Sequence, residues 1–160
     1  MKALPALFHA LCLALLGPAA QAQLQVQRLD GSTVTLDAAA LAALPHEPVQ
    51  AEAHGHRIEA QAVDLLQVLR AAGVVPPQQV RGAALRQVLL AGARDGYAAA
   101  FSWGELDPAL GGRRVFLVTG GLRPDEGPLR LVVPADARPA RWVRQLASLQ
   151  LLAPPAPAPP

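Results

Sequence analysis

The sequence has 160 residues, a formal net charge of +2 and a single cysteine. This length allows one ordinary domain with its own core. The lone cysteine excludes a disulfide framework, and the small net charge excludes a polybasic nucleic-acid binder. The charge is uneven, however, because seven arginines and three acidic residues lie within residues 113–144.

The N-terminus has the three parts of a secretory signal peptide. Lys2 is followed by an apolar run that is too short to span a bilayer, and Ala20-Gln21-Ala22 fits a cleavage site. We therefore expect a signal peptide at residues 1–22, a mature chain that begins at Gln23, and a periplasmic or secreted location. The alternatives are an uncleaved anchor, which the short run disfavours, and a lipoprotein modified at Cys12, which lies inside that run.

The mature chain divides into one domain and a tail. Residues 23–152 carry the hydrophobic patterns of a folded domain. Residues 153–160 contain only alanine and proline, which is typical of a polyproline-like segment with nothing to bury. We expect this tail to be disordered.

The first half of the domain reads as strands with two helices. Apolar and polar residues alternate on both sides of Asp30-Gly31, a dipeptide typical of a hairpin turn. Asp37 is a suitable N-cap for a short helix that ends before Pro45. Apolar residues at helical spacing predict a second helix over residues 62–72. Two more strands are expected, at residues 49–53 and 57–60.

The second half reads as strands joined by short turns. Asp95-Gly96 predicts a hairpin, and Ser102 is a suitable cap for a helical turn that contains Glu105. Residues 138–142 are expected to form a turn or a short helix. Strands are expected at residues 85–91, 97–101, 115–118, 129–133 and 148–151.

These elements together predict the fold class. Many short strands with two or three short helices, in no regular alternation, favour an α+β fold with a mainly antiparallel, mixed sheet. We expect the strands to belong to one small sheet. The sequence has no glycine-rich phosphate loop, no nucleophile elbow and no cysteine-based metal motif.

Short motifs follow one another along nearly the whole domain, at residues 31–36, 41–45, 63–66, 69–74, 95–97, 127–134 and 141–143. In order and spacing they resemble the oxidoreductase molybdopterin-binding domain family, whose fold is that of sulfite oxidase. The resemblance covers about residues 30–151 and implies a sulfite-oxidase-like fold for this chain.

The resemblance also implies what an active member needs. Active members hold a molybdenum pterin cofactor through a cysteine thiolate, and backbone groups and basic side chains hold its phosphate. The matching segment here, residues 49–55, has no cysteine, and a methyl group or an imidazole does not replace a soft thiolate. We therefore expect no cofactor, with molybdopterin as the alternative by resemblance. Whether the chain is an enzyme stays open.

His54-Gly55-His56 occupies the place of that missing ligand. Two imidazoles one residue apart, together with His46 or Glu47, could hold copper or zinc. Gly55 favours instead a turn at a polar hairpin tip, so no metal site is predicted.

The strongest candidate binding residues lie in the C-terminal arginine cluster. The resemblance places this stretch beside the cofactor's phosphate, and the guanidinium groups of Arg138 and Arg141 can bind phosphate or carboxylate. Trp142 could stack on a ligand, or it could be part of the core. His54 or Tyr97 is expected on the opposite wall, although Tyr97 could also simply pack beside its turn. Replacing either arginine should leave folding nearly unaffected, since an exposed arginine contributes little.

The sequence thus predicts a periplasmic, sulfite-oxidase-like domain without molybdenum redox chemistry. It would act as a binding or accessory module for a small anionic ligand or a partner protein. Neither nucleic acid nor, after removal of the signal, a membrane is an expected partner. The alternatives are a genuine molybdopterin-binding oxidoreductase subunit and a periplasmic copper or zinc binder through His54 and His56.

Overall fold

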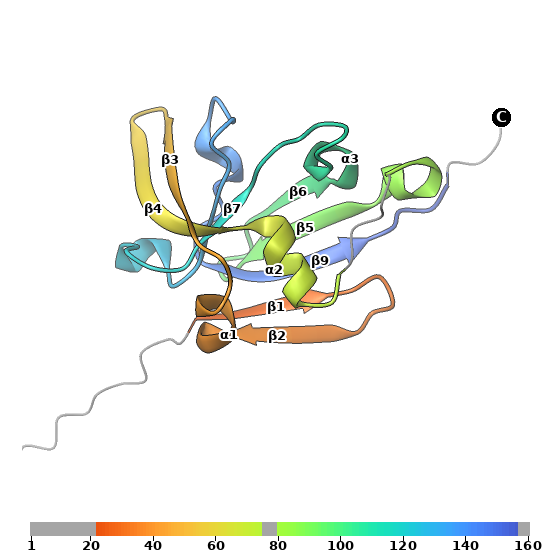
Figure 1. Ribbon diagram of the computed structural model, residues 1–160, viewed down its shortest axis with the longest axis horizontal. Helices are drawn as coiled ribbons and strands as arrows, with labels where there is room; N and C mark the ends of the chain where they lie inside the picture. The colour runs from red at the N-terminus through yellow and green to blue at the C-terminus, as the bar shows by residue number, and fades with distance from the viewer. Residues whose placement is uncertain (1–21, 75–79, 157–160) are drawn as a thin grey trace, which may run out of the picture.

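Alternating apolar and polar residues build two β-sheets in the computed structural model, which describes residues 22–74 and 80–156 (Figure 1). Sheet A has five strands in the order β2-β1-β9-β5-β6. Within it, β1 and β9 run parallel, and the other neighbouring strands are antiparallel. The strands of sheet A are β1 (Gln23–Gln27), β2 (Thr33–Asp37), β5 (Val88–Ala93), β6 (Ala98–Ser102) and β9 (Leu146–Leu152).

Sheet B has four antiparallel strands in the order β3-β4-β7-β8. They are β3 (Glu47–Ala53), β4 (His56–Asp64), β7 (Phe116–Val118) and β8 (Arg130–Val132). His54 and Gly55 form the two-residue turn between β3 and β4, with φ angles of 50° and 74°. Positive φ at both positions matches the natural twist of a hairpin, and the glycine accepts it without strain.

Three short α-helices begin at the side chains that can cap them. The carboxylate of Asp37 accepts the backbone N–H of Ala40 at the start of α1, and that of Asp64 accepts the N–H of Leu66 at the start of α2. Ser102 and Glu105 form a capping box at α3. The α-helices are α1 (Ala38–Ala42), α2 (Leu65–Ala71) and α3 (Trp103–Leu106), and the 3₁₀ turns are η1 (Gly82–Arg86), η2 (Pro124–Glu126) and η3 (Pro139–Arg141).

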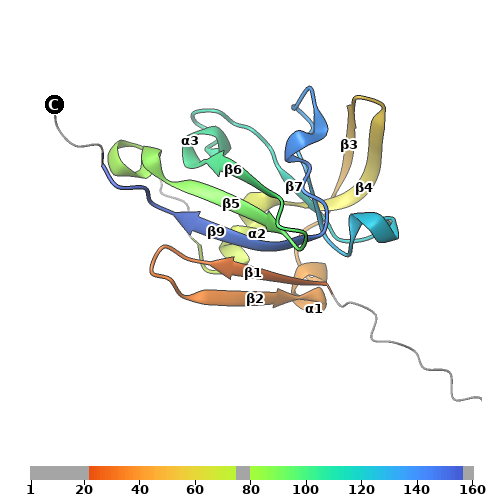
Figure 2. The ribbon, with the colours of Figure 1, turned by 180° about the vertical axis from the view of Figure 1, so that it is seen from behind.

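The core lies between α2, sheet A and sheet B. Leu65, Val68 and Leu69 of α2 are almost fully buried, as are Leu24 and Leu149 on the inner face of sheet A. The chain that leads into β9 joins the two sheets, because Leu131 of β8 donates its N–H to the Val143 carbonyl. The opposite face of sheet A is not covered by another of the described elements (Figure 2).

The structure confirms the predicted fold class, α+β with mainly antiparallel strands and three short α-helices. It corrects two details. The strands form two sheets rather than one small sheet. Helix α2 begins only at Leu65, because Ala62 and Val63 pair with β7 and Asp64 then caps the helix.

Most of the predicted signal peptide lies outside the described residues, as does the end of the tail. Residues 153–156 follow β9 without regular secondary structure. Within the described ranges, none of the helices has the length and apolar character needed to cross a membrane.

Candidate anion-binding site

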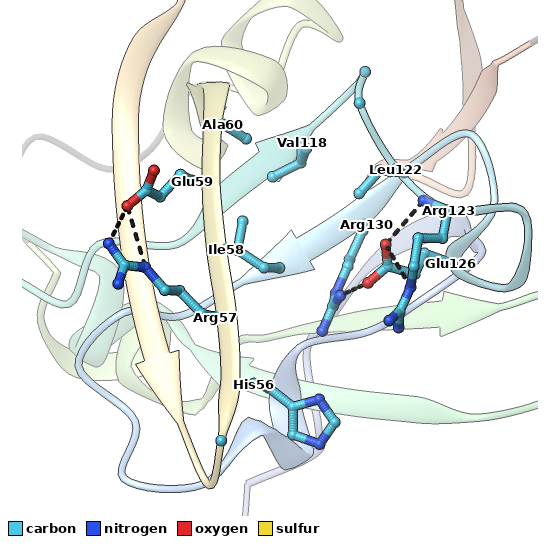
Figure 3. A pocket seen from close by; sticks show the side chains of 13 residues that line it. His56, Arg57, Ile58, Glu59, Ala60, Val118, Leu122, Arg123, Glu126 and Arg130 are labelled. Carbon is cyan, nitrogen blue, oxygen red and sulfur yellow. Dashed lines mark hydrogen bonds and ion pairs between the residues drawn. The ribbon is translucent and has the colours of Figure 1, made fainter.

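A cavity of about 430 Å³ opens on one face of sheet B, beside the β3–β4 hairpin (Figure 3). Pairing of β4, β7 and β8 places Ala60, Val118 and Arg130 on this same face. The loop of residues 120–123 and the turn η2 complete the lining. The hairpin and the turn thus enclose a space that the sheet alone would leave open.

The cavity has an apolar side and a charged side. Ile58, Ala60 and Val118 form the apolar side, and the side chains of Arg130, Glu126 and Arg123 face it across the space (Figure 3). Leu122 lies at one end, and His56 lies near the hairpin tip at the other. Such a site can take a ligand with an anionic group on a small apolar body.

Arg130 is the deepest charged group of the cavity. It is 5% exposed, and its Nη1 forms an ion pair with Glu126, which is 7% exposed. Its buried Nε has no hydrogen-bond partner among the described residues. Burial lowers the pKa of Arg130, an effect that the negative charge of Glu126 opposes. A buried N–H without an acceptor is costly, so the Arg130 guanidinium is incompletely satisfied within the protein.

The turn η2 fixes the carboxylate that meets Arg130. Glu126 accepts the backbone N–H of Arg123 at 2.9 Å, and its own carbonyl accepts the N–H of Gln145 at 2.7 Å. Gly127 follows with φ +76°, and a Cβ there would lie 2.9 Å from the Cα of Gln145. Only glycine allows this close approach, which holds Glu126 against Arg130.

Most of the C-terminal residues predicted from the sequence have partners within the protein. Arg141 donates to Asp136 at 2.7 and 2.9 Å and to Glu105 at 3.1 Å, and it lies over the Phe101 ring at 4.9 Å. The hydrogen bonds to Asp136 raise the pKa of Arg141. The expectation that Arg141 is an exposed side chain with little effect on folding is therefore corrected, since it is half-buried in an ion-pair network.

Trp142 and Tyr97 also make contacts inside the fold. Trp142 is 3% exposed, and its indole N–H donates to the Val133 carbonyl at 2.9 Å. The guanidinium of Arg130 stands 5.6 Å from the centre of the Trp142 ring, so the tryptophan supports the cavity from within the core. The hydroxyl of Tyr97 donates to the Ala140 carbonyl at 2.5 Å, which brings Tyr97 to the C-terminal turn.

Arg138 and His54 remain exposed. Arg138 precedes η3, and no ion pair or side-chain hydrogen bond joins it to another described residue. His54 occupies the turn of the hairpin in sheet B, whereas Tyr97 follows β5 of sheet A. The expectation that one sheet carries these residues is thus wrong, and no hydrogen bond links His54 to the C-terminal turn within the described ranges.

The histidines do not gather with other ligands. Among residues 22–74 and 80–156, no group of three histidine, cysteine or acidic side chains is placed to hold a metal ion. The Nδ1 of His46 lies 2.7 Å from the Leu44 carbonyl oxygen, and its Nε2 lies 3.4 Å from the Thr119 hydroxyl oxygen.

A second cavity of similar volume lies beside β3, next to Arg113 and Arg114. Both arginines are already paired, Arg113 with Asp136 at 3.2 Å and Arg114 with Glu47 and Asp64. This cavity therefore offers a ligand less unsatisfied charge than the Arg130 cavity does.

Comparison with solved structures identifies the architecture. The chain is similar to a chain in the crystal structure of the sulfane dehydrogenase SoxCD from Paracoccus pantotrophus, with 20% sequence identity and a TM-score of 0.61. The fold is sulfite-oxidase-like. The match covers 82% of this chain and 38% of the SoxCD chain, so this protein spans well under half of that length. No family model and no curated protein sequence matches this chain.

The sulfite-oxidase-like fold implies a molybdenum pterin cofactor by resemblance, but the residues at the expected ligand position do not fit the metal. Ala53 ends β3, is 4% exposed and pairs with His56 across the hairpin. Residues 49–55 contain no cysteine, and the chain's one cysteine, Cys12, lies in the predicted signal peptide outside the described residues. This domain supplies no thiolate to molybdenum.

Sequence reasoning missed Arg130 and Glu126 as site residues. Arg130 falls within a strongly apolar run, Leu129 to Val133, where a strand buried on both faces would place a charged side chain in the interior. An arginine in such a run needs a buried partner, and Glu126 lies four residues before it. The four-residue spacing between Glu126 and Arg130 was the sequence signal that could have identified this buried pair.

Proposed function

We propose that this protein is a periplasmic binding or accessory module of sulfite-oxidase-like fold that binds a small anionic ligand at Arg130, without molybdenum redox chemistry. The observation that supports it best is the guanidinium of Arg130, a cavity-lining residue whose buried Nε has no acceptor and whose Nη1 alone is engaged, among the described residues. The carboxylate of Glu126 engages only one of the guanidinium nitrogens. Nη2 has no hydrogen-bond partner among the described residues and is not fully buried, so a ligand oxygen in the cavity can accept from it.

The charge around the cavity limits the ligand. Glu126 pairs with Arg130 and Arg123, and Asp125 pairs with Arg123 as well, so the carboxylates offset the arginine charges and the site favours a ligand of low negative charge. The apolar side formed by Ile58, Ala60 and Val118 favours a carboxylate on a small hydrocarbon body. A carboxylate side chain of a partner protein would offer the same chemistry as a free acid.

Calorimetric titration with benzoate, acetate and inorganic phosphate tests this proposal. Wild-type protein is expected to bind at least one of these anions. Arg130→Lys keeps a positive charge for Glu126 but removes the planar set of N–H donors, so affinity should fall by about tenfold or more. Arg57→Lys is the matched control, because Arg57 lines the same cavity but is exposed and paired with Glu59.

The same titration separates the cavity from the C-terminal turn. If Arg138→Gln abolishes binding and Arg130→Lys does not, the ligand binds at the turn and the Arg130 site is wrong. If wild-type protein binds none of the three anions, and an acidic peptide does not bind either, the binding function itself fails.

Metal analysis of protein purified from its native compartment tests the absence of redox chemistry. We expect molybdenum well below one atom per chain, because residues 49–55 lack a thiolate. We expect the same of copper and zinc, because no group of three ligands gathers among the described residues. About one molybdenum per chain would overturn the proposal in favour of a molybdopterin-binding subunit. About one copper or zinc, lost in His54→Asn, would favour a metal binder.

A further inference from the structure

One face of sheet A packs on the core, and the other is open (Figure 2). Along β1, Leu24 and Val26 are fully buried, whereas the intervening Gln25 is exposed. Strand pairing places Thr35 of β2 and Ser148 of β9 beside Gln25 on the same side. We call this side, made of every second residue of β1, β2, β5, β6 and β9, the open face.

The open face lacks charged side chains apart from one at its corner. Its positions carry glutamine, threonine, serine, alanine, glycine, valine or leucine. The exception is Asp37 at the end of β2, whose carboxylate accepts the backbone N–H of Ala40 in α1. The exposed side of the β3–β4 hairpin differs, because it carries Glu52, Arg57 and Glu59. The chain as a whole is 16% charged, so the open face, with one charged side chain, is poorer in charge than the chain average.

The open face has two bands. Its β5–β6 half is mostly apolar and includes Leu90, Ala100 and Gly92, while its β1–β2 half is polar and, apart from Asp37, uncharged. A Cβ at Gly92 would lie 2.7 Å from the Ser148 hydroxyl oxygen, so the glycine leaves room for that hydroxyl. Glycine within a strand weakens it and often marks a close approach of another backbone.

We propose that the open face is an interface through which two copies of this chain pack sheet on sheet. A two-fold contact sets a patch against itself, so charges of one sign would meet and repel. A neutral face has no such repulsion and suits a second copy of itself. Two sheets of this kind pack about 10 Å apart with strand directions within about 30° of each other.

The size of the face sets the strength of the contact. Five strands about 4.8 Å apart, each with about five residues rising about 3.3 Å, span roughly 24 by 16 Å. The resulting area is about half of the roughly 800 Å² that each partner buries in a standard stable interface. The dimer should therefore be weak and depend on concentration.

Sedimentation equilibrium of the exported protein, from micromolar to millimolar concentration, tests this inference. The average mass of wild-type protein should rise towards twice that of the monomer. Ala100→Arg and Gln25→Arg, which place a charge on the two halves of the open face, should stay monomeric. Gln50→Arg, at an exposed strand position of sheet B, should associate like wild-type protein.

Circular dichroism of each variant shows whether it is folded, and having two open-face variants keeps the test valid if one of them fails to fold. Wild-type protein that stays monomeric over the whole range would overturn the inference. So would folded open-face variants that dimerise as strongly as wild-type protein.

Discussion

The guanidinium of Arg130 and the carboxylate of Glu126 form an ion pair between side chains that are only 6% and 10% exposed. The pair joins β8 to η2, the two elements that form the charged side of the cavity. Trp142 lies behind the guanidinium. The site is therefore built into the packing of the domain, and its residues affect both stability and binding.

Arg130→Met should destabilise the domain by about 3–5 kcal/mol, because it leaves the buried Glu126 carboxylate without its closest cation. Urea denaturation followed by circular dichroism measures the change. The double variant Arg130→Met/Glu126→Leu should recover much of the loss, since no unpaired charge remains buried. Equal stability of Arg130→Met and wild-type protein would show that the pair is solvated.

The two arginines of the C-terminal turn should differ in their effect on folding. Arg141→Gln removes one of the two cations, with Arg113, that join Asp136 and Glu105, so it should lower the free energy of unfolding by about 1–3 kcal/mol. Arg138→Gln, at an exposed position, should change it by less than about 0.5 kcal/mol. Thermal denaturation of both variants at the same pH compares them, and an equal loss would contradict this assignment.

Trp142→Ala should lower the free energy of unfolding by about 3–5 kcal/mol, because a fully packed indole is lost from the core. It should also weaken anion binding, since the ring supports the Arg130 guanidinium. Trp142→Phe, which keeps an aromatic ring but loses the hydrogen bond to Val133, should cost less. A stable Trp142→Ala variant would place the indole outside the core.

Gly127→Ala and Gly121→Ala form a matched pair, since both glycines have positive φ. At Gly121 a Cβ meets nothing within 4 Å, so alanine adds only backbone strain of about 1–2 kcal/mol. At Gly127 the Cβ also meets the backbone of Gln145, so Gly127→Ala should be clearly less stable than Gly121→Ala. Chemical denaturation of the two variants in parallel measures the difference.

The mature protein should begin at Gln23, because Ala20-Gln21-Ala22 follows a short apolar run. Intact mass spectrometry of the protein recovered after export checks this, allowing for cyclisation of the new N-terminal glutamine. A mass that still includes residues 1–22 would contradict both the cleavage and the proposed location.

The sequence by itself determined the helix caps and hairpin turns, because these depend only on residues that are neighbours in the chain. Asp37 and Ser102 cap helices because a short polar side chain can reach the free N–H groups of the next turn. Asp30-Gly31 and Asp95-Gly96 mark hairpin turns for a similarly local reason. The order of short motifs also indicated the sulfite-oxidase-like fold, which the structural similarity bears out.

Only the tertiary structure decided which residues meet. Arg141 looked like an exposed ligand-binding residue, but Glu105, 36 residues earlier in the chain, and Asp136 engage its charge. In the sequence Arg130 is recognisable only as a strand residue. In the structure η2 brings Glu126 to it, and the β3–β4 hairpin closes a cavity over it. Strand pairing and packing bring Glu105 to Arg141 and the hairpin over Arg130, and no periodicity within a single segment encodes these long-range contacts.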